Sequence, residues 1–170
     1  MCIYAASTTM TTTASDRVSF RVARRDDLDR IIALLADDEI ARGRAGYAAA
    51  PTASVVAAFA EIERDPNNEL IVGEHDGGIV ACMQLTYIPG LSRGGMRRAQ
   101  VESVRVRADL RGQRIGERLM EHAMDRARQR GCALIQLTTD LRRADAHRFY
   151  QRLGFEATHA GMKRMLASKT

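Results

Sequence analysis

The sequence predicts an α/β domain in which helices flank a mixed central sheet. Segments that alternate apolar and polar residues interchange with segments whose apolar residues recur every three or four positions. A helical segment over 115–130 joins two strand segments, 99–106 and 132–138, which is the arrangement of a βαβ unit with parallel strands. The Asp76-Gly77 pair lies between two further strand segments and indicates an antiparallel hairpin. Both strand orientations are therefore expected in one sheet.

The first part of the chain is expected to form one strand and two helices. Alternation over 18–23 predicts the strand, and apolar residues at helical spacing predict helices over 24–41 and 52–64. Two glycines and a proline mark the segment between the helices, 43–51, as a loop. The side chains expected to face the core from these helices are Leu28, Ile31, Ile32, Leu35, Ile40, Val55, Val56, Phe59 and Ile62.

The strand at 99–106 follows a loop over 89–98 and contains a break in its alternation. Val101 falls on one face of the strand, whereas Val104 and Val106 fall on the other. A β-bulge between them explains the change of face. Because a bulge frees backbone groups and often lies beside an active site, this strand is a candidate for carrying chemistry.

The remaining elements complete the βαβ unit and close the domain. The helix before the strand at 132–138 places these residues along one side: Ile115, Leu119, Met120, Ala123 and Ala127. The strand itself is nearly all apolar, which predicts burial on both faces. A further helix is expected over 142–154, and one or two closing strands over 155–166.

One domain over 17–170 is expected, because 170 residues suffice for a single core. The threonine-rich segment 1–16 lacks the basic start and apolar centre of a signal peptide and is predicted to be a disordered tail, with Met10 as an alternative start. Three widely spaced cysteines do not make a disulfide framework, which indicates a reducing, cytoplasmic setting. No apolar run approaches the roughly 20 residues that span a membrane.

The net charge of +5 is mild, and the basic residues are scattered among acidic ones. No Lys/Arg block, basic stripe with interleaved aromatics or zinc-ligand spacing is present in the sequence. We therefore expect neither a nucleic-acid partner nor a metal. A partner that carries phosphates suits the charge equally well.

The stretch "RGQRIG", residues 111–116, places a glycine-bearing loop before a helix. Free N–H groups and the helix dipole at such a position favour an anion, most often a phosphate. A P-loop would need Lys-Ser/Thr after the second glycine, where Glu117-Arg118 stand. A dinucleotide fingerprint would need three glycines near the first strand. Taken alone, the two glycines are equally explained by a turn and close helix packing.

The order of strand "VESVRV", loop "RGQRIG", amphipathic helix and "AHRFYQRLGF" resembles the GNAT superfamily of acetyl-CoA-dependent N-acetyltransferases. The resemblance extends over about 18–166 and is strongest over 101–155. In the coenzyme loop, Arg111 and Gly116 match the ends of the family pattern, and Gly112 matches a common extra glycine. Arg114 replaces the inner glycine of the pattern and adds a cation there.

A second match is in the predicted helix over 142–154, where Arg143 occupies the position of a family asparagine. The matching residues are Ala146, Phe149, Tyr150, Gly154 and Phe155. The stretches "DAHRFY" and "THAGMKRML" are most similar to the branch that contains aminoalkylphosphonate N-acetyltransferases.

The resemblance implies the GNAT (acyl-CoA N-acyltransferase) fold, acetyl-CoA as co-substrate and no metal. It also implies direct attack of an amine on the thioester in a ternary complex. The residues that the resemblance assigns to coenzyme binding are Val104, Arg105, Val106, Arg111, Gly112, Gln113, Arg114, Ile115, Gly116, Arg143 and Ala146.

Two side chains are expected to carry the proton transfers. Tyr150 matches the family residue that protonates the departing thiolate; without the motif, it would be interpreted as a core aromatic residue. Glu102, on the bulged strand, is the candidate base that accepts the proton of the amine. The alternatives for Glu102 are a solvent-facing carboxylate and a ligand that only positions the amine. Backbone N–H groups at the bulge would polarise the thioester carbonyl.

The acceptor is expected to contact the two variable loops. Tyr47 and Arg44 lie in the loop that the resemblance places at the acceptor site. Arg93, Arg97 and Arg98 lie in the loop at 89–98 and suit a phosphonate, phosphate or carboxylate. That loop is equally explained as a solvated flap or as a subunit contact in a homodimer.

The expected function is therefore N-acetylation of a primary amine on a small molecule. Two alternatives are an acetyltransferase that acts on lysine or N-terminal amines of proteins, and a module that senses acetyl-CoA without turnover.

Overall fold

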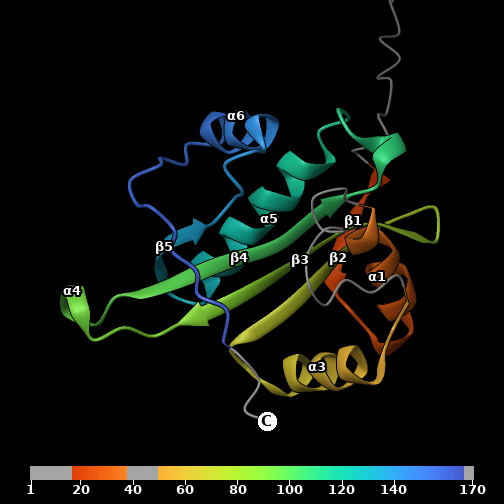
Figure 1. The fold of residues 1–170 in the computed structure, drawn as a ribbon, viewed down its shortest axis with the longest axis horizontal. Helices are drawn as coiled ribbons and strands as arrows, with labels where there is room; N and C mark the ends of the chain where they lie inside the picture. The colour runs from red at the N-terminus through yellow and green to blue at the C-terminus, as the bar shows by residue number, and fades with distance from the viewer. Residues whose placement is uncertain (1–16, 38–49, 167–170) are drawn as a thin grey trace, which may run out of the picture.

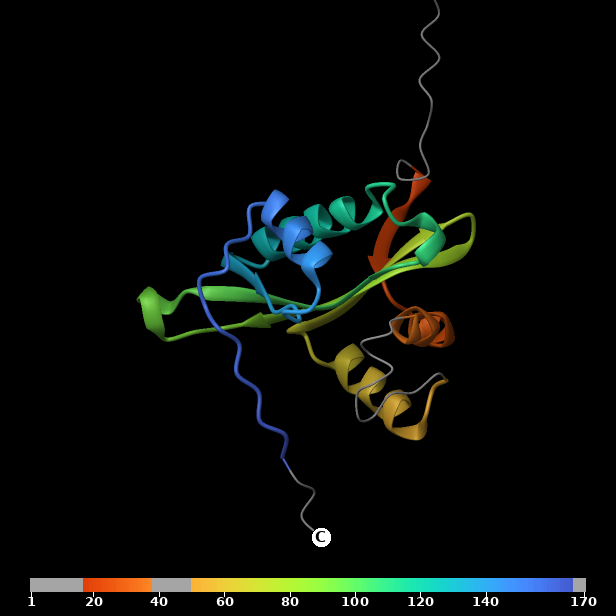
Figure 2. The same cartoon turned by 45° about the horizontal axis from the view of Figure 1, so that its top comes forward.

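The computed structural model describes residues 17–37 and 50–166 (Figure 1). Within these ranges, one five-stranded sheet has the strand order β1-β2-β3-β4-β5. Figure 2 shows α5 and α6 on one side of the sheet and α1 and α3 on the other. The fold is thus the predicted α/β arrangement with a mixed sheet. The tail predicted over 1–16, the core residue Ile40 and the loop predicted over 43–49 lie outside the described residues.

The N-terminal elements are β1 (Ser19–Val22), a short 3-10 turn η2 (Arg25–Asp27), α1 (Leu28–Ala36) and α3 (Ala53–Arg64). Helix α3 begins as predicted, with the Thr52 hydroxyl accepting a hydrogen bond from the N–H of Val55 at 3.3 Å. Both helices pack on one face of β2 and β3. The buried members of this smaller core are Ala23, Leu28, Ile31, Ile32, Leu34, Phe59, Val72, Ile79 and Cys82.

The antiparallel part of the sheet is formed by β2 (Asn68–His75), β3 (Gly78–Ile88) and β4 (Arg97–Val106). The predicted turn between β2 and β3 is confirmed, with Asp76 and Gly77 both at positive φ, 48° and 71°. Two such residues in succession form the tight turn that suits the twist of a hairpin. Between β3 and β4, the predicted loop contains one short helical turn, α4 (Ser92–Gly95), at the tip of a long hairpin.

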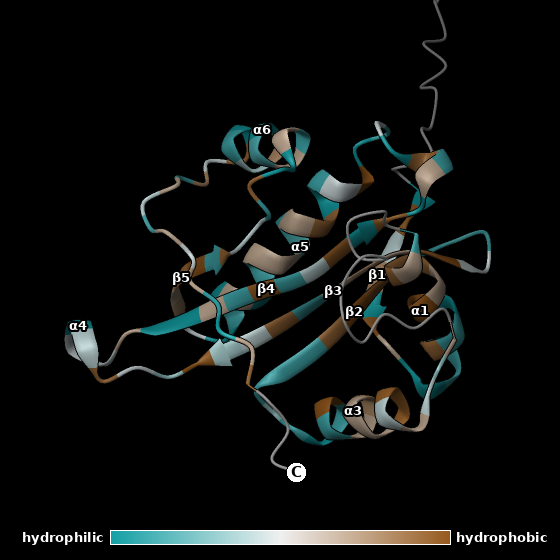
Figure 3. Ribbon diagram, in the orientation of Figure 1, coloured by the Kyte–Doolittle hydropathy of each residue, from teal (hydrophilic) through white to brown (hydrophobic). Residues whose placement is uncertain are grey.

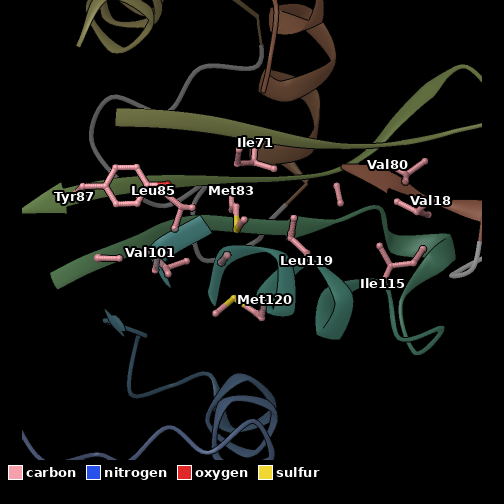
Figure 4. Close-up of a cluster of buried hydrophobic side chains, with 14 residues drawn as sticks. Val18, Ile71, Val80, Met83, Leu85, Tyr87, Val101, Ile115, Leu119 and Met120 are labelled. Atoms are coloured by element: carbon pink, nitrogen blue, oxygen red, sulfur yellow. The ribbon is translucent and has the colours of Figure 1, made fainter. Parts of the chain in front are cut away.

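The parallel part of the sheet confirms the predicted βαβ unit. Helix α5 (Ile115–Gln129) joins β4 to β5 (Cys132–Leu137), and these two strands pair in parallel. The side of α5 that was predicted to be apolar is buried in the main core (Figure 4). The fully buried residues of α5 and the sheet that meet there include Ile71, Met83, Leu85, Val101, Ile115, Leu119 and Met120.

A buried carboxylate in the sheet binds two arginines at the end of α5. Glu69 in β2 is 5% exposed, and its carboxylate accepts hydrogen bonds from Arg126 at 2.6 and 2.9 Å. The guanidinium of Arg130 and the phenol of Tyr87 donate to the same carboxylate at 2.9 and 3.0 Å. Burial alone would raise the pKa of Glu69, but hydrogen bonds from the two arginines outweigh it, and the pKa lies below its usual value.

Two predictions about the second half of the chain were wrong. The strand β5 is not buried on both faces, because Ala133 and Leu134 are exposed. Helices α1 and α3 cover β2 and β3 on one face of the sheet. The described residues of the smaller core beneath these helices include none from β5, so this face of β5 is left uncovered by that core. Residues 155–166 form no strand, and Met162, Met165 and Leu166 are exposed. Their spacing does not alternate, so a strand there would have no consistent face to bury.

Figure 3 shows hydrophilic ribbon at the starts of β2 and β4, where the sheet extends past the helices. No helix within 17–37 or 50–166 is long and apolar enough to cross a membrane.

Candidate active site

The predicted β-bulge is present in β4. Cys82 pairs with Arg105 and Gln84 pairs with Glu102, so Met83 alone lies opposite the two residues between them, Ser103 and Val104. Ser103 has a φ of 56°, in the left-handed region that non-glycine residues rarely occupy. The bulge therefore bends the backbone at the point where the sequence predicted free N–H groups.

Beyond the bulge, β4 and β5 separate. The parallel pairing covers Arg97–Val101 of β4 and ends at the pair Val101–Leu137. Residues 102–106 of β4 have no partner in β5, although they still pair with β3. The edge of β4 that would join β5 is therefore open from residue 102 to residue 106, and an N–H group directed to this edge has no partner in β5. Fixed donors in such a place can stabilise a developing oxyanion.

The loop at 111–116 follows β4 after a short turn, η3 (Ala108–Leu110), and leads into α5. Gly112 has a φ of 79° and Arg114, the N-cap residue, a φ of 62°. Arg114 thus adopts a left-handed conformation, at a cost of about 1–2 kcal/mol. Gly116 has a different role: a Cβ there would lie 3.4 Å from the Phe149 ring and 3.7 Å from Val106. Gly112 therefore allows the turn, and Gly116 allows the close packing.

The two arginines of this loop have partners within the chain. The guanidinium of Arg114 donates to both carboxylate oxygens of Glu117, at 2.8 and 2.9 Å, and this lowers the pKa of Glu117. Arg111 donates through Nε to the carbonyl of Val106 at 3.1 Å. Its Nη2 also contacts Asp37 at the end of α1, 3.3 Å from the carboxylate. Arg111 therefore connects the ends of β4 and α1, whereas Arg114 lies along the first turn of α5.

Tyr150 projects from α6 (Ala144–Arg152) and packs against the main core. Its ring centroid lies 5.1 Å from that of Phe149 and 5.8 Å from that of Phe155. Burial raises the pKa of the Tyr150 phenol, while the positive charges of Arg105 and Arg143 oppose the increase. The phenol is therefore protonated at neutral pH and lies within the electrostatic range of cations from β4 and the start of α6.

A cavity of about 240 Å³ lies between α5 and α6, next to the loop. It is lined by Glu117, Phe149, Arg152 and Leu153. The guanidinium of Arg152 lies over the Phe149 ring, 6.0 Å from its centroid. The sequence interpretation did not single out Arg152, because no family motif position marks it.

The candidate residues for the acceptor are more dispersed. Glu102 is exposed and lies on the sheet face opposite α5. Arg93 lies in α4, at the far end of the hairpin from the loop that precedes α5 (Figure 1). Arg97 begins β4 and donates to Asn67. The structure therefore does not bring Arg93 or Arg97 to Glu102.

The remaining acceptor candidates, Tyr47 and Arg44, lie outside the described residues. Ala146 lies half-buried one turn before Tyr150, and Gln113 is exposed in the loop, where it contacts the carbonyl of Asp109 at 3.4 Å. In the described part of the chain, no group of three or more His, Cys, Asp or Glu side chains is arranged to hold a metal ion.

Sequence reasoning also missed a set of glutamines close to Glu102. Gln84 is its direct neighbour in β3, and Gln100 and Gln136 lie on the same face in β4 and β5. Gln84 and Gln136 each interrupt a mainly apolar strand, whereas Gln100 lies among charged residues, so no shared sequence pattern groups the three. Only the strand register shows that they are adjacent.

Known proteins resemble this chain in both sequence and fold. The family model described as the acetyltransferase (GNAT) family matches residues 23–155. An aminoalkylphosphonate N-acetyltransferase of Salmonella typhimurium is 31% identical over 139 residues, covering 82% of this chain and 85% of the relative.

Two solved structures extend the comparison. The crystal structure of a transcriptional regulator from Bacillus halodurans is 46% identical with a TM-score of 0.83, covering 88% of this chain and 99% of that one. A Trypanosoma brucei acetyltransferase is 26% identical with a TM-score of 0.71 and the same coverage, 88% and 99%. Because the family model spans most of the chain and a named N-acetyltransferase aligns over most of its length, this chain is an acyltransferase that belongs to the GNAT family of acetyltransferases.

Proposed function

We propose that this protein transfers the acetyl group of acetyl-CoA to a primary amine of a small molecule, by direct attack in a ternary complex. The observation that carries the proposal is the separation of β4 from β5 after Val101–Leu137. The bulged backbone of β4 borders this opening, the loop at 111–116 follows β4 after the turn η3, and the cations around Tyr150 come from β4 and the start of α6. The Salmonella relative, whose name gives a small aminoalkylphosphonate as acceptor, supports a small-molecule acceptor here.

The coenzyme phosphates fit the start of α5. The loop at 111–116 presents N–H groups and the positive end of a 15-residue helix. Arg114 lies at this end and can turn from Glu117 towards a phosphate. The backbone of Val104, Arg105 and Val106 would accept the pantetheine arm along the open edge of β4.

Three groups then divide the chemistry of transfer. As the amine nitrogen attacks the thioester carbonyl carbon, a C–N bond forms, and N–H groups at the bulge stabilise the oxygen. Glu102 accepts the proton that the nitrogen loses, directly or through water. When the C–S bond breaks, the Tyr150 phenol donates its proton to the departing thiolate. Glu102 then releases its proton to solvent and Tyr150 takes one back from solvent, so atoms and charge balance over one turnover.

The function is tested by measuring thiol release from acetyl-CoA with a panel of primary amines. The panel contains small amines, a lysine peptide and a peptide with a free N-terminus. We expect release with small amines above the rate without acceptor. Release with the peptides alone would favour a protein acetyltransferase. Coenzyme binding with no release for any amine would favour a sensing module, which would also suit the regulatory description of the Bacillus relative.

We expect Gly112→Pro to weaken acetyl-CoA binding at least tenfold. Gly112 has a φ of 79°, which proline cannot adopt, so the loop must change its path and lose N–H groups aimed at the phosphates. Calorimetric titration of acetyl-CoA measures the change. Gly94→Pro is the matched control, because Gly94 has a φ of 71° at the hairpin tip. Equal effects of the two variants would contradict the assignment of the loop.

Glu117→Gln is expected to tighten acetyl-CoA binding several-fold. The substitution releases Arg114 from its carboxylate partner and removes a negative charge beside the phosphates, and because the pair is exposed the effect is small. Asp125→Asn is the control, because Asp125 pairs with Arg128 at 2.6 Å farther along the same helix. The gain should shrink in high salt. An unchanged or weaker affinity would show that Arg114 does not contact the phosphates.

A further inference from the structure

A row of polar side chains crosses four strands on the sheet face opposite α5. The register places Asn68 beside Thr86, Thr86 beside Gln100 and Gln100 beside Gln136, so that β2, β3, β4 and β5 each contribute one residue. We call these four residues the amide row. All four are half-buried. The row is thus continuous across the sheet, although its members are far apart in the sequence.

Hydrogen bonds within the row hold its side chains in place. The Thr86 hydroxyl donates to Oδ1 of Asn68 at 2.7 Å, and Nε2 of the neighbouring Gln84 donates to the same oxygen at 3.2 Å. Nε2 of Gln136 donates to Oε1 of Gln100 at 2.8 Å. A primary amide offers two donor hydrogens and an acceptor oxygen, so these bonds use only part of its capacity. The row is therefore preorganised and still able to bind a ligand.

The apolar cover on this face stops before the amide row. The smaller core under α1 and α3 contains Val72 and Cys82 from β2 and β3, and among the described residues it contains none from β4 or β5. The half of the row contributed by Gln100 and Gln136 therefore lies beside the helices rather than under them. A polar surface that is half-buried, fixed and close to an opening in the sheet suits a small ligand.

The row lies next to the proposed site of transfer. Gln136 precedes Leu137, the last residue of β5 that pairs with β4. Glu102 lies two residues beyond Gln100 on the same face, roughly 7 Å along the strand. An amine held at Glu102 would therefore have the rest of its molecule over Gln84, Gln100 and Gln136.

We propose that the amide row recognises the acceptor and selects a primary amine that carries hydroxyl groups and no anionic group. The inference rests on the proposed function and specifies its substrate class. A hydroxyl group donates and accepts hydrogen bonds, as the amides and Thr86 do, so each side can satisfy the other. A phosphonate only accepts hydrogen bonds. It could bind the amide N–H groups but would leave the amide oxygens without a donor, and the Glu102 carboxylate would repel it.

Two arginines of β4, Arg98 and Arg105, flank the row. Arg98, next along β4 on the same face, pairs with Ile88 at the end of β3. Arg98 and Glu102 are four residues apart, roughly 13 Å along the strand. Arg105, on the other side of Glu102, donates to the carbonyl of Val104 and lies on the coenzyme side of the bulge.

The experiment compares three amines: D-glucosamine, cyclohexylamine, which keeps a six-membered ring without hydroxyl groups, and 2-aminoethylphosphonate. Their dissociation constants are measured by calorimetry with the full chain saturated with CoA, and their kcat and KM by thiol release. We expect glucosamine to bind most tightly. Gln100→Leu and Gln136→Leu should each weaken glucosamine binding about tenfold, since a lost hydrogen bond is worth about 1–1.5 kcal/mol. In both variants, the dissociation constant and the kcat for cyclohexylamine should change less than twofold.

Gln129→Leu is the control, because Gln129 is exposed at the end of α5, away from this face. Tighter binding of 2-aminoethylphosphonate than of glucosamine would overturn the inference, as would an unchanged glucosamine affinity in both row variants. Equal weakening of all three amines would indicate a structural role and would also overturn it. Absence of thiol release with every amine would reject the proposed function instead, and the calorimetric comparison would still decide whether the row binds hydroxyl groups.

Discussion

Replacing Tyr150 with phenylalanine is expected to lower kcat for acetyl transfer by about 100-fold, the lower range for loss of a positioned general acid. The substitution removes the proton donor but keeps the ring that packs between Phe149 and Phe155. The affinity for acetyl-CoA and the unfolding free energy should therefore change little. Steady-state thiol release gives kcat, and calorimetry gives the affinity.

The pH profile provides a second measurement of the same role. Burial raises the pKa of the Tyr150 phenol above its usual value near 10, so the protonated, active form persists to higher pH than a free phenol would allow. We expect kcat of the native chain to fall at alkaline pH as Tyr150 loses its proton. The phenylalanine variant should lack this decrease.

Tyr87→Phe is the matched control for this variant. The Tyr87 phenol is also buried, with its pKa raised to about 12, but it donates to Glu69 at the far end of α5. This variant should lose stability while its kcat stays close to that of the native chain. If Tyr150→Phe left kcat unaltered, Tyr150 would be a core residue only.

The second large effect is expected at Glu69. Replacing it with alanine should destabilise the chain by about 3–5 kcal/mol, because removing one partner of a buried ion pair leaves the others uncompensated. Arg126 and Arg130 would lose their carboxylate, and the Tyr87 phenol would lose its acceptor. Chemical denaturation monitored by circular dichroism measures the loss. Glu74→Ala is the control, since Glu74 pairs with Arg21 on a more exposed surface and should cost less than about 1 kcal/mol.

The contribution of Glu69 should also depend on pH in a defined direction. Its pKa in the folded chain lies below the ordinary glutamate value of 4.5, so the folded state favours the ionised form. The stabilisation is fully present above pH 4.5 and is lost as the pH falls through the folded pKa. The difference in unfolding free energy between the native chain and Glu69→Gln should therefore narrow in acid. A constant difference from pH 7 to pH 3 would contradict this account.

Local patterns in the sequence predicted most of the fold. The Asp76-Gly77 turn, the buried side of α5 and the parallel pairing of β4 with β5 follow from short-range rules of turn chemistry, helical periodicity and crossover connection. The bulge at Ser103 was also predictable, because a change of face within one strand leaves a visible break in the alternation. These features depend on residues that are close in the chain.

Features that depend on distant contacts were not predictable in this way. The exposure of Leu134 is set by where α1 and α3 end on the sheet, which the apolar composition of β5 does not reveal. The same limit applies to the candidate site. Arg93 was grouped with the acceptor because its loop is long and basic, but the length of the hairpin carries it away from Glu102. Gln84 and Gln136 become neighbours of the site only through strand register.

The left-handed backbone at Ser103 and Arg114 has a consequence for protein engineering. Each residue occupies a conformation that costs a side-chain-bearing residue about 1–2 kcal/mol and costs glycine almost nothing. Together they offset a noticeable part of the 5–15 kcal/mol that typically separates folded from unfolded chains. A thermostable scaffold could therefore be sought by introducing glycine at these two positions. Both positions also shape the opening where transfer is proposed, so a screen for heat resistance should be scored for turnover as well.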